Sequence, residues 1–102
     1  MTTPDKLGGL LGIARRAGQL AVGFDAAAAA VTNGDSRLIL VCTDLSPKTE
    51  KECRFVGSAH RADVLPLPYD KAALARLIGA AKPVGVVAVC GQNFEKAIRL
   101  AL

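Results

Sequence analysis

The run Leu38-Ile39-Leu40-Val41-Cys42 decides the fold, because its five side chains are all apolar. A strand with one face in water alternates apolar and polar residues, so an unbroken run indicates a central strand covered on both faces. Residues 84–89 form a second run of this kind, which ends in Val86-Val87-Ala88-Val89. The chain is therefore expected to place two strands in the middle of a sheet with helices on both sides.

Two weaker segments complete the predicted sheet. Residues 20–22 are short and apolar, and residues 64–67 contain Pro66. Proline cannot donate a ladder hydrogen bond, so the second segment is predicted to be an edge strand. Helical patterns separate the strands, and residues typical of helix starts and stops bound them: Thr3, Pro4, Gly18, Gly23, Asp25, Asn33, Gly34, Ser46, Pro47, Asp70, Gly79 and Asn93.

Helices and strands alternate along the whole chain. This order predicts an α/β fold, a three-layer α/β/α sandwich around a four-stranded sheet. Residues 1–102 show no internal repeat and no linker composition, so we expect a single domain. Side chains of the third helix expected to face inward are Cys53, Val56 and His60.

The composition favours a binding protein over a disordered or membrane-spanning chain. Hydrophobic residues make up 51% of the sequence, the formal net charge is +4 and the pI is about 9.3. A modest positive charge favours polyanions, whereas the scarcity of aromatic residues argues against a platform that stacks several bases. Without a signal-peptide pattern or a long apolar run, we expect a cytoplasmic protein that does not enter a membrane.

The residues typical of catalysis are few. His60 is the only histidine, and no nucleophile–base pair or metal-ligand spacing is visible, so we expect no enzyme activity, cofactor or metal. Asp44 follows a buried strand, where a capping role is favoured over a catalytic one. The three cysteines lack CxxC spacing and are expected to be reduced, buried thiols, with Cys42 and Cys90 close together if their strands are neighbours.

Gly8, Gly9 and Gly12 lie inside the first predicted helix without a preceding strand. They do not form a phosphate loop, so close helix packing is the better explanation.

Basic side chains near helix ends and loops supply candidate contacts to a phosphate backbone: Arg15, Arg16, Arg37 and Lys82. An ordinary solvated surface is the alternative. The turn Val22-Gly23-Phe24-Asp25 is more specific, because it places accessible backbone N–H groups at a helix N-terminus, which attracts phosphates. A plain strand-to-helix connection is the alternative there.

The segment Leu10-Leu11-Gly12-Ile13-Ala14-Arg15-Arg16-Ala17-Gly18 resembles the start of small bacterial YlxQ-type proteins of the L7Ae/L30e superfamily, which contains ribosomal and kink-turn RNA-binding proteins. The resemblance continues in order along nearly the whole chain, through these segments: Gly23 and Gly34 around the second helix, Arg37-Leu38-Ile39-Leu40-Val41 with Asp44, Leu67-Pro68-Tyr69 with Leu74 and Gly79, Val87-Ala88-Val89, and Phe94-Glu95-Lys96-Ala97. It implies a mixed four-stranded sheet and recognition of bent, structured RNA by shape and by unstacked bases.

The resemblance also implies two contact regions. One is the Gly23-led turn, where the family typically carries Asn, Glu and Lys at the positions held here by Asp25, Ala26 and Ala29. The other is the loop of Lys82, Pro83 and Val84, which would pack on an extruded base. Alanine offers neither donor nor acceptor, so we expect weaker discrimination between RNA sequences.

The predicted RNA-binding residues are Arg15, Arg16, Gly23, Phe24, Asp25, Ala26, Ala29, Arg37, Lys82, Pro83 and Val84. We expect the second helix, which Gly23 opens, and the segment around Pro83 to converge on one electropositive edge. The expected partner is ribosomal or other structured RNA, bound by a monomer or weak homodimer associated with the ribosome. The alternative is a protein-interaction module that has lost RNA recognition and uses the flat, alanine-rich second helix as its docking face.

Overall fold

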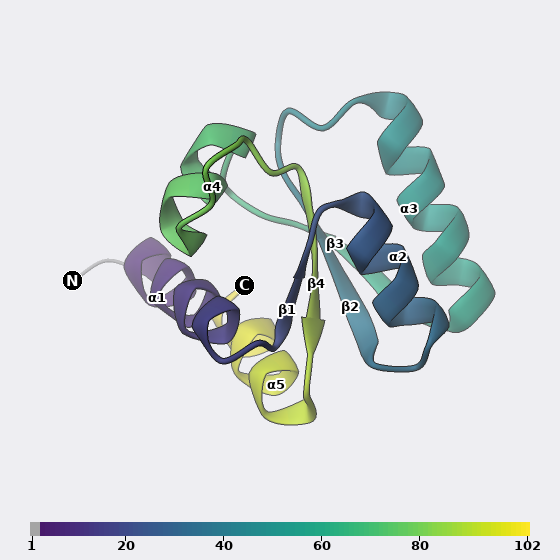
Figure 1. The fold of residues 1–102 in the computed structure, drawn as a ribbon, viewed down its shortest axis with the longest axis horizontal. Helices are drawn as coiled ribbons and strands as arrows, with labels where there is room; N and C mark the ends of the chain where they lie inside the picture. Colours follow the sequence, from purple (N-terminus) through teal and green to yellow (C-terminus); the bar gives the residue numbers. More distant parts are fainter. Residues whose placement is uncertain (1–2) are drawn as a thin grey trace.

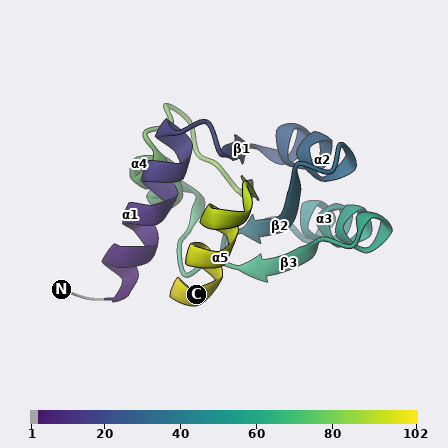
Figure 2. The same ribbon diagram turned by 90° about the horizontal axis from the view of Figure 1, so that it is seen from below.

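The computed structural model describes residues 3–102, and side chains from Lys6 onward. Nine elements follow one another along the chain: α1 (Thr3–Arg16), β1 (Leu20–Val22), α2 (Phe24–Thr32), β2 (Ser36–Val41), α3 (Pro47–His60), β3 (Asp63–Pro66), α4 (Lys71–Ile78), β4 (Val86–Cys90) and α5 (Gln92–Ala101). The sheet lies between two helical layers, with α1, α4 and α5 on one side and α2 and α3 on the other (Figures 1 and 2). The predicted three-layer sandwich is confirmed.

The sheet is mixed and has the order β1-β4-β2-β3. β4 pairs antiparallel with both β1 and β2, and β2 pairs parallel with β3. The two unbroken apolar runs are thus the two central strands, as expected. β3 lies at an edge, which is where Pro66 can be accommodated because its missing N–H is not needed by a neighbour.

Two separate cores cover the two faces of the sheet. On one face Leu38, Leu40, Val87 and Val89 pack with helices α1, α4 and α5, and on the other Ile39, Val41, Val86 and Ala88 pack with α2 and α3. Successive residues of β2 and β4 therefore point into different cores, and both must be apolar. This is the physical reason for the absence of alternation in these runs.

Local signals fix most helix ends. Ser46 accepts a hydrogen bond from Thr49 N–H and caps α3, with Pro47 in its first position, and Asp70 likewise caps α4 through Ala73 N–H (2.8 Å). The prediction that Asn93 caps α5 is wrong, because Gly91, with a φ of 83°, makes the turn and α5 already begins at Gln92.

Gly12 in α1 and His60 in α3 differ in how they agree with the sequence. A Cβ atom on Gly12 would lie 3.0 Å from Leu77 O, so glycine permits close packing of α1 on α4. The close helix packing expected at this glycine is confirmed. His60 was expected to face inward but is exposed, because α3 ends there and turns away at Arg61. None of the helices within residues 3–102 is long and apolar enough to cross a membrane.

The expected proximity of Cys42 and Cys90 is wrong. Their strands are neighbours, but β2 and β4 run antiparallel, so Val41 pairs with Val86 while Cys90 pairs with Ser36 at the opposite end. All three thiols are free, and Cys42 is buried and donates a hydrogen bond to Val84 O (3.2 Å). Burial, followed by the charges of Asp44 and Asp70, raises the pKa of Cys42 to about 11.

Ser36 offers a test of the sheet's hydrogen-bonding. Its buried hydroxyl donates to Val89 O (2.7 Å) and accepts from Leu38 N–H (3.3 Å) at an irregularity between β2 and β4. Ser36→Ala should leave both backbone groups buried without this partner and lower the free energy of unfolding by about 1–3 kcal/mol in urea titration. Ser58→Ala, at an exposed position of α3, is the matched control; equal midpoints for the two variants would contradict the assigned role.

The Cys42 thiol predicts a loss of stability at alkaline pH. In the unfolded chain the thiol ionises near its ordinary pKa of 9.0, whereas in the folded chain it stays protonated to about pH 11. Stability should therefore fall between these pH values, by up to about 3 kcal/mol. Cys42→Ser removes this titrating group and should make the fall in unfolding free energy from pH 8 to 11 smaller. Part of the fall should remain, because burial also raises the pKa of Cys53 and of Cys90. Parallel profiles for the two proteins would rule out the Cys42 thiol as a cause.

Candidate nucleic-acid interface

Gly23 joins β1 directly to α2 at one end of the sheet, at the top of Figure 1. Its N–H donates to Val86 O (2.8 Å), the first residue of β4. Its φ of 92° is a conformation that other L-residues rarely adopt, and α2 has no side-chain cap at this end. The first N–H groups of α2 therefore point out of the sheet end, where an acceptor from a partner can reach them.

The loop before β4 lies beside this turn. Gly23 is hydrogen-bonded to Val86, so the loop of residues 82–85 ends beside the residue that leads into α2. Lys82 and Pro83 are exposed, whereas Val84 is only 7% exposed and packs in the core. Lys82 and Pro83 are thus the side chains of this loop that a partner can contact.

The alanine run of α2 divides into two faces. Ala27 and Ala30 are buried against the sheet and Ala28 is half-buried, while Ala26 and Ala29 are exposed together with Asp25. The exposed alanines leave room for a partner but offer no polar atom to it. One face of α2 therefore belongs to the core, and only the opposite face is open to another molecule.

We call this end of the sheet the Gly23 edge, made of residues 23–26, 42–50, 67–71 and 79–85. Its charged side chains are three lysines and four carboxylates: Lys48, Lys71, Lys82, Asp25, Asp44, Glu50 and Asp70. Asp44 caps α4 by accepting from Lys71 N–H (2.9 Å), which confirms its expected capping role. The expectation of an electropositive edge is wrong, since the charges at this end nearly cancel.

Arg15, Arg16 and Arg37 lie at the other end of the sheet. Arg37 follows Ser36, which pairs with Cys90, and Cys90 N–H donates to Gln19 O just after α1. Gly23 lies opposite Val86, four residues along β4, so the two groups are about 13 Å apart along the strand. The antiparallel pairing of β2 and β4 thus places these predicted phosphate contacts at the opposite end of the sheet from Gly23 and Lys82.

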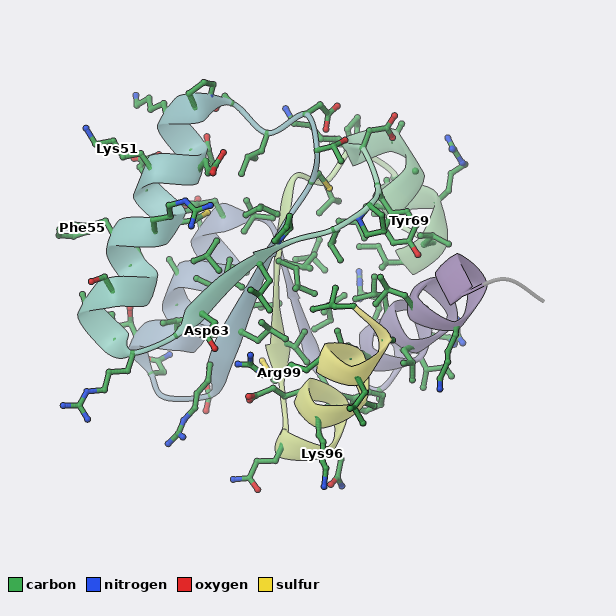
Figure 3. The ribbon with its side chains drawn as sticks, turned by 180° about the vertical axis from the view of Figure 1, so that it is seen from behind. Lys51, Phe55, Asp63, Tyr69, Lys96 and Arg99 are labelled. Atoms are coloured by element: carbon green, nitrogen blue, oxygen red, sulfur yellow. The ribbon has the colours of Figure 1, made fainter. Side chains whose placement is uncertain are left out.

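This second end, which we call the arginine end, is made of residues 13–19, 33–37, 60–63 and 90–99. It contains a cavity of about 520 Å³ lined by Gly34, Asp35, Arg37, Gly91, Gln92, Glu95, Lys96 and Arg99. Arg99 pairs with Asp63 (2.9 Å) and Glu95 (3.0 Å) and donates to Arg37 O (3.4 Å) (Figure 3). The i,i+4 spacing of Glu95 and Arg99 was a usable sequence signal, but Asp63 comes from a distant strand and carried none.

Sequence reasoning also missed an apolar hollow between α2 and α3. It has a volume of about 340 Å³ and is lined by Phe24, Lys51, Glu52, Phe55 and Val56. Phe55 is 75% exposed and, with Lys51, projects outward from α3 (Figure 3). Within the described residues, no group of three or more His, Cys, Asp or Glu side chains is placed to hold a metal ion.

Solved structures of other proteins share this architecture. A protein of unknown function from Bacillus halodurans has 27% sequence identity and a TM-score of 0.85, over 94% of this chain and 95% of that one. The 15.5 kD RNA-binding protein of Giardia lamblia, at 15% identity, has a TM-score of 0.79 over 97% of this chain and 83% of that chain, and shows the same fold. No curated protein matches the sequence significantly.

A family model covers nearly the entire sequence. It matches residues 5–98, and so includes the Gly23 turn, the loop before β4 and most of the arginine end. The chain belongs to the Ribosomal protein L7Ae/L30e/S12e/Gadd45 family.

Proposed function

We propose that this chain binds structured RNA through the Gly23 edge. The observation that carries the proposal is the Gly23 N–H to Val86 O hydrogen bond, which holds the open start of α2 beside the first residue of β4, the strand that follows the Lys82-Pro83 loop. Backbone N–H groups at a helix start can bind phosphate oxygens or base edges. Membership of the family supports the proposal, as does the fold shared with an RNA-binding protein of Giardia lamblia.

The RNA class we propose is a bent internal loop of the kink-turn type. A folded RNA is recognised by its shape and by bases that leave the stack, and an edge formed by a helix start and a neighbouring loop is suited to such a shape. Ala26 and Ala29 are exposed but apolar, so base edges would gain few hydrogen bonds there. We infer modest affinity and weak sequence discrimination.

We further propose a YlxQ-type, ribosome-associated accessory role in the cytoplasm, with ribosomal RNA as the partner and with no catalysis. The alternative, docking of a protein on α2, has less support, because Ala27 and Ala30 are used within the fold. Failure of the chain to bind kink-turn RNA and total ribosomal RNA at low salt would favour that alternative.

Ala29→Glu tests the position of the surface. A carboxylate on the exposed side of α2 should repel phosphates and weaken binding of a labelled kink-turn RNA roughly tenfold at low salt. Leu100→Glu is the matched control, since this residue is 81% exposed on α5 in the opposite layer and the change adds the same charge. Equal losses in fluorescence anisotropy titrations would show that α2 is not the contact helix.

The triple variant Asp25→Asn/Ala26→Glu/Ala29→Lys tests whether the missing polar side chains cause the weak discrimination between RNA sequences. The triple change restores the polar side chains typical of the family at three exposed positions. Each bidentate base contact is worth about 1–3 kcal/mol, so affinity for a kink-turn should rise at least tenfold over that for a matched RNA lacking the G·A pairs. Should the original chain already discriminate as strongly, the missing side chains are not the limiting factor.

A further inference from the structure

The arginine end carries most of the excess charge of the molecule. Six cations and three carboxylates lie there, which leaves a formal charge of +3: Arg15, Arg16, Arg37, Arg61, Lys96, Arg99, Asp35, Asp63 and Glu95. Arg99 neutralises Asp63 and Glu95 by ion pairs. Among the side chains described, the other five cations form no ion pair, so their charges face solvent.

These cations extend across the whole width of the sheet. Arg15 and Arg16 precede β1, Lys96 follows β4, and Arg37 is the second residue of β2. Arg61 precedes β3, the last strand in the order β1-β4-β2-β3. Four strands at about 4.8 Å spacing span about 14 Å, so the row is long enough to meet successive phosphates of a nucleic-acid strand.

The cavity at this end lies beside the start of α5. Gly91 precedes that helix without a side-chain cap, and Arg37 and Lys96 line the same cavity. Figure 3 shows Lys96 projecting from α5 at this end of the molecule. Asp35 is the one unpaired carboxylate in the lining, so cations predominate around the opening.

Arg61 adds an independent observation. It is the only non-glycine residue with a positive φ (58°) in the described part of the chain, at the C-cap of α3. Glycine is favoured at such a position, because a side chain there is strained. An arginine is thus held at a site where the backbone would favour a residue without a side chain.

We infer that the arginine end is a second RNA-binding surface, which contacts the phosphate backbone while the Gly23 edge reads RNA shape. The inference rests on the proposed function. Four of its five unpaired cations are arginines, whose planar guanidinium groups form paired hydrogen bonds to phosphate, whereas the exposed cations of the Gly23 edge are lysines. Charge that the Gly23 edge lacks is supplied by this opposite end.

The test is a salt titration of labelled kink-turn RNA with Arg15→Gln/Arg16→Gln/Arg37→Gln. The loss of three phosphate contacts should make the negative slope of log K against log salt less steep by about two to three. It should also weaken binding at least tenfold at 100 mM salt. The control, Lys6→Gln/Lys51→Gln/Arg76→Gln, removes three exposed charges from α1, α3 and α4 outside both surfaces. It should change affinity less than threefold.

The outcomes separate the two proposals. If the original chain binds no RNA at low salt, the proposed function fails and this inference fails with it. If it binds, and Ala29→Glu weakens binding while the arginine variant keeps the original slope, only the second surface is overturned. Loss of binding to anionic vesicles by the arginine variant, with RNA affinity intact, would also overturn it and assign the surface to lipid phosphates.

The Arg61→Gly variant distinguishes an RNA contact of Arg61 from a purely structural role. Removing the strained side chain should raise the melting temperature and still weaken RNA binding, by roughly threefold at 100 mM salt for one phosphate contact. A higher melting temperature with unchanged RNA affinity would count against Arg61 as part of the surface.

Discussion

The antiparallel ladder that holds β4 between β1 and β2 determines both ends of this molecule. Val86, Val87, Ala88 and Val89 are all buried, with alternate residues in two different cores, so β4 cannot shift by one residue without moving every side chain to the wrong core. Its first residue holds Gly23 and its last pairs with Ser36. The position of each candidate surface therefore follows from the register of one strand.

The ladder also explains why the open backbone N–H groups and the unpaired arginines lie at opposite ends of the sheet. The Gly23 edge offers open backbone groups beside an exposed loop, but its lysines are matched by carboxylates that are partly used to cap α4. At the arginine end, the guanidinium groups of Arg15, Arg16, Arg37 and Arg61 form no ion pair among the described side chains. A chain of 102 residues with a net charge of +4 thus has a strongly uneven distribution of that charge between its two ends.

Most of the fold could be predicted because its signals are local. Ser46 and Asp70 mark helix starts, and the apolar runs at residues 38–42 and 84–89 mark central strands. The start of α5 was misplaced because Gly91, not Asn93, makes the turn. The distribution of the arginines could not be predicted, since it depends on whether β2 and β4 run parallel or antiparallel, and no residue in either run determines that direction. The Arg99–Asp63 pair likewise joins elements that are distant in the chain.

The two glycine-led turns have a consequence for the electrostatics of the backbone. β1 and β4 run in opposite directions, and each passes through a glycine of positive φ into a helix, α2 on one face of the sheet and α5 on the other. The macrodipoles of these two helices consequently oppose each other, with one positive pole at each end of the sheet. α3 and α4 also begin at the Gly23 edge, so three helices place their positive poles at that edge and α5 places its positive pole at the arginine end. The helix dipoles therefore offset part of the negative charge that the carboxylates bring to the Gly23 edge.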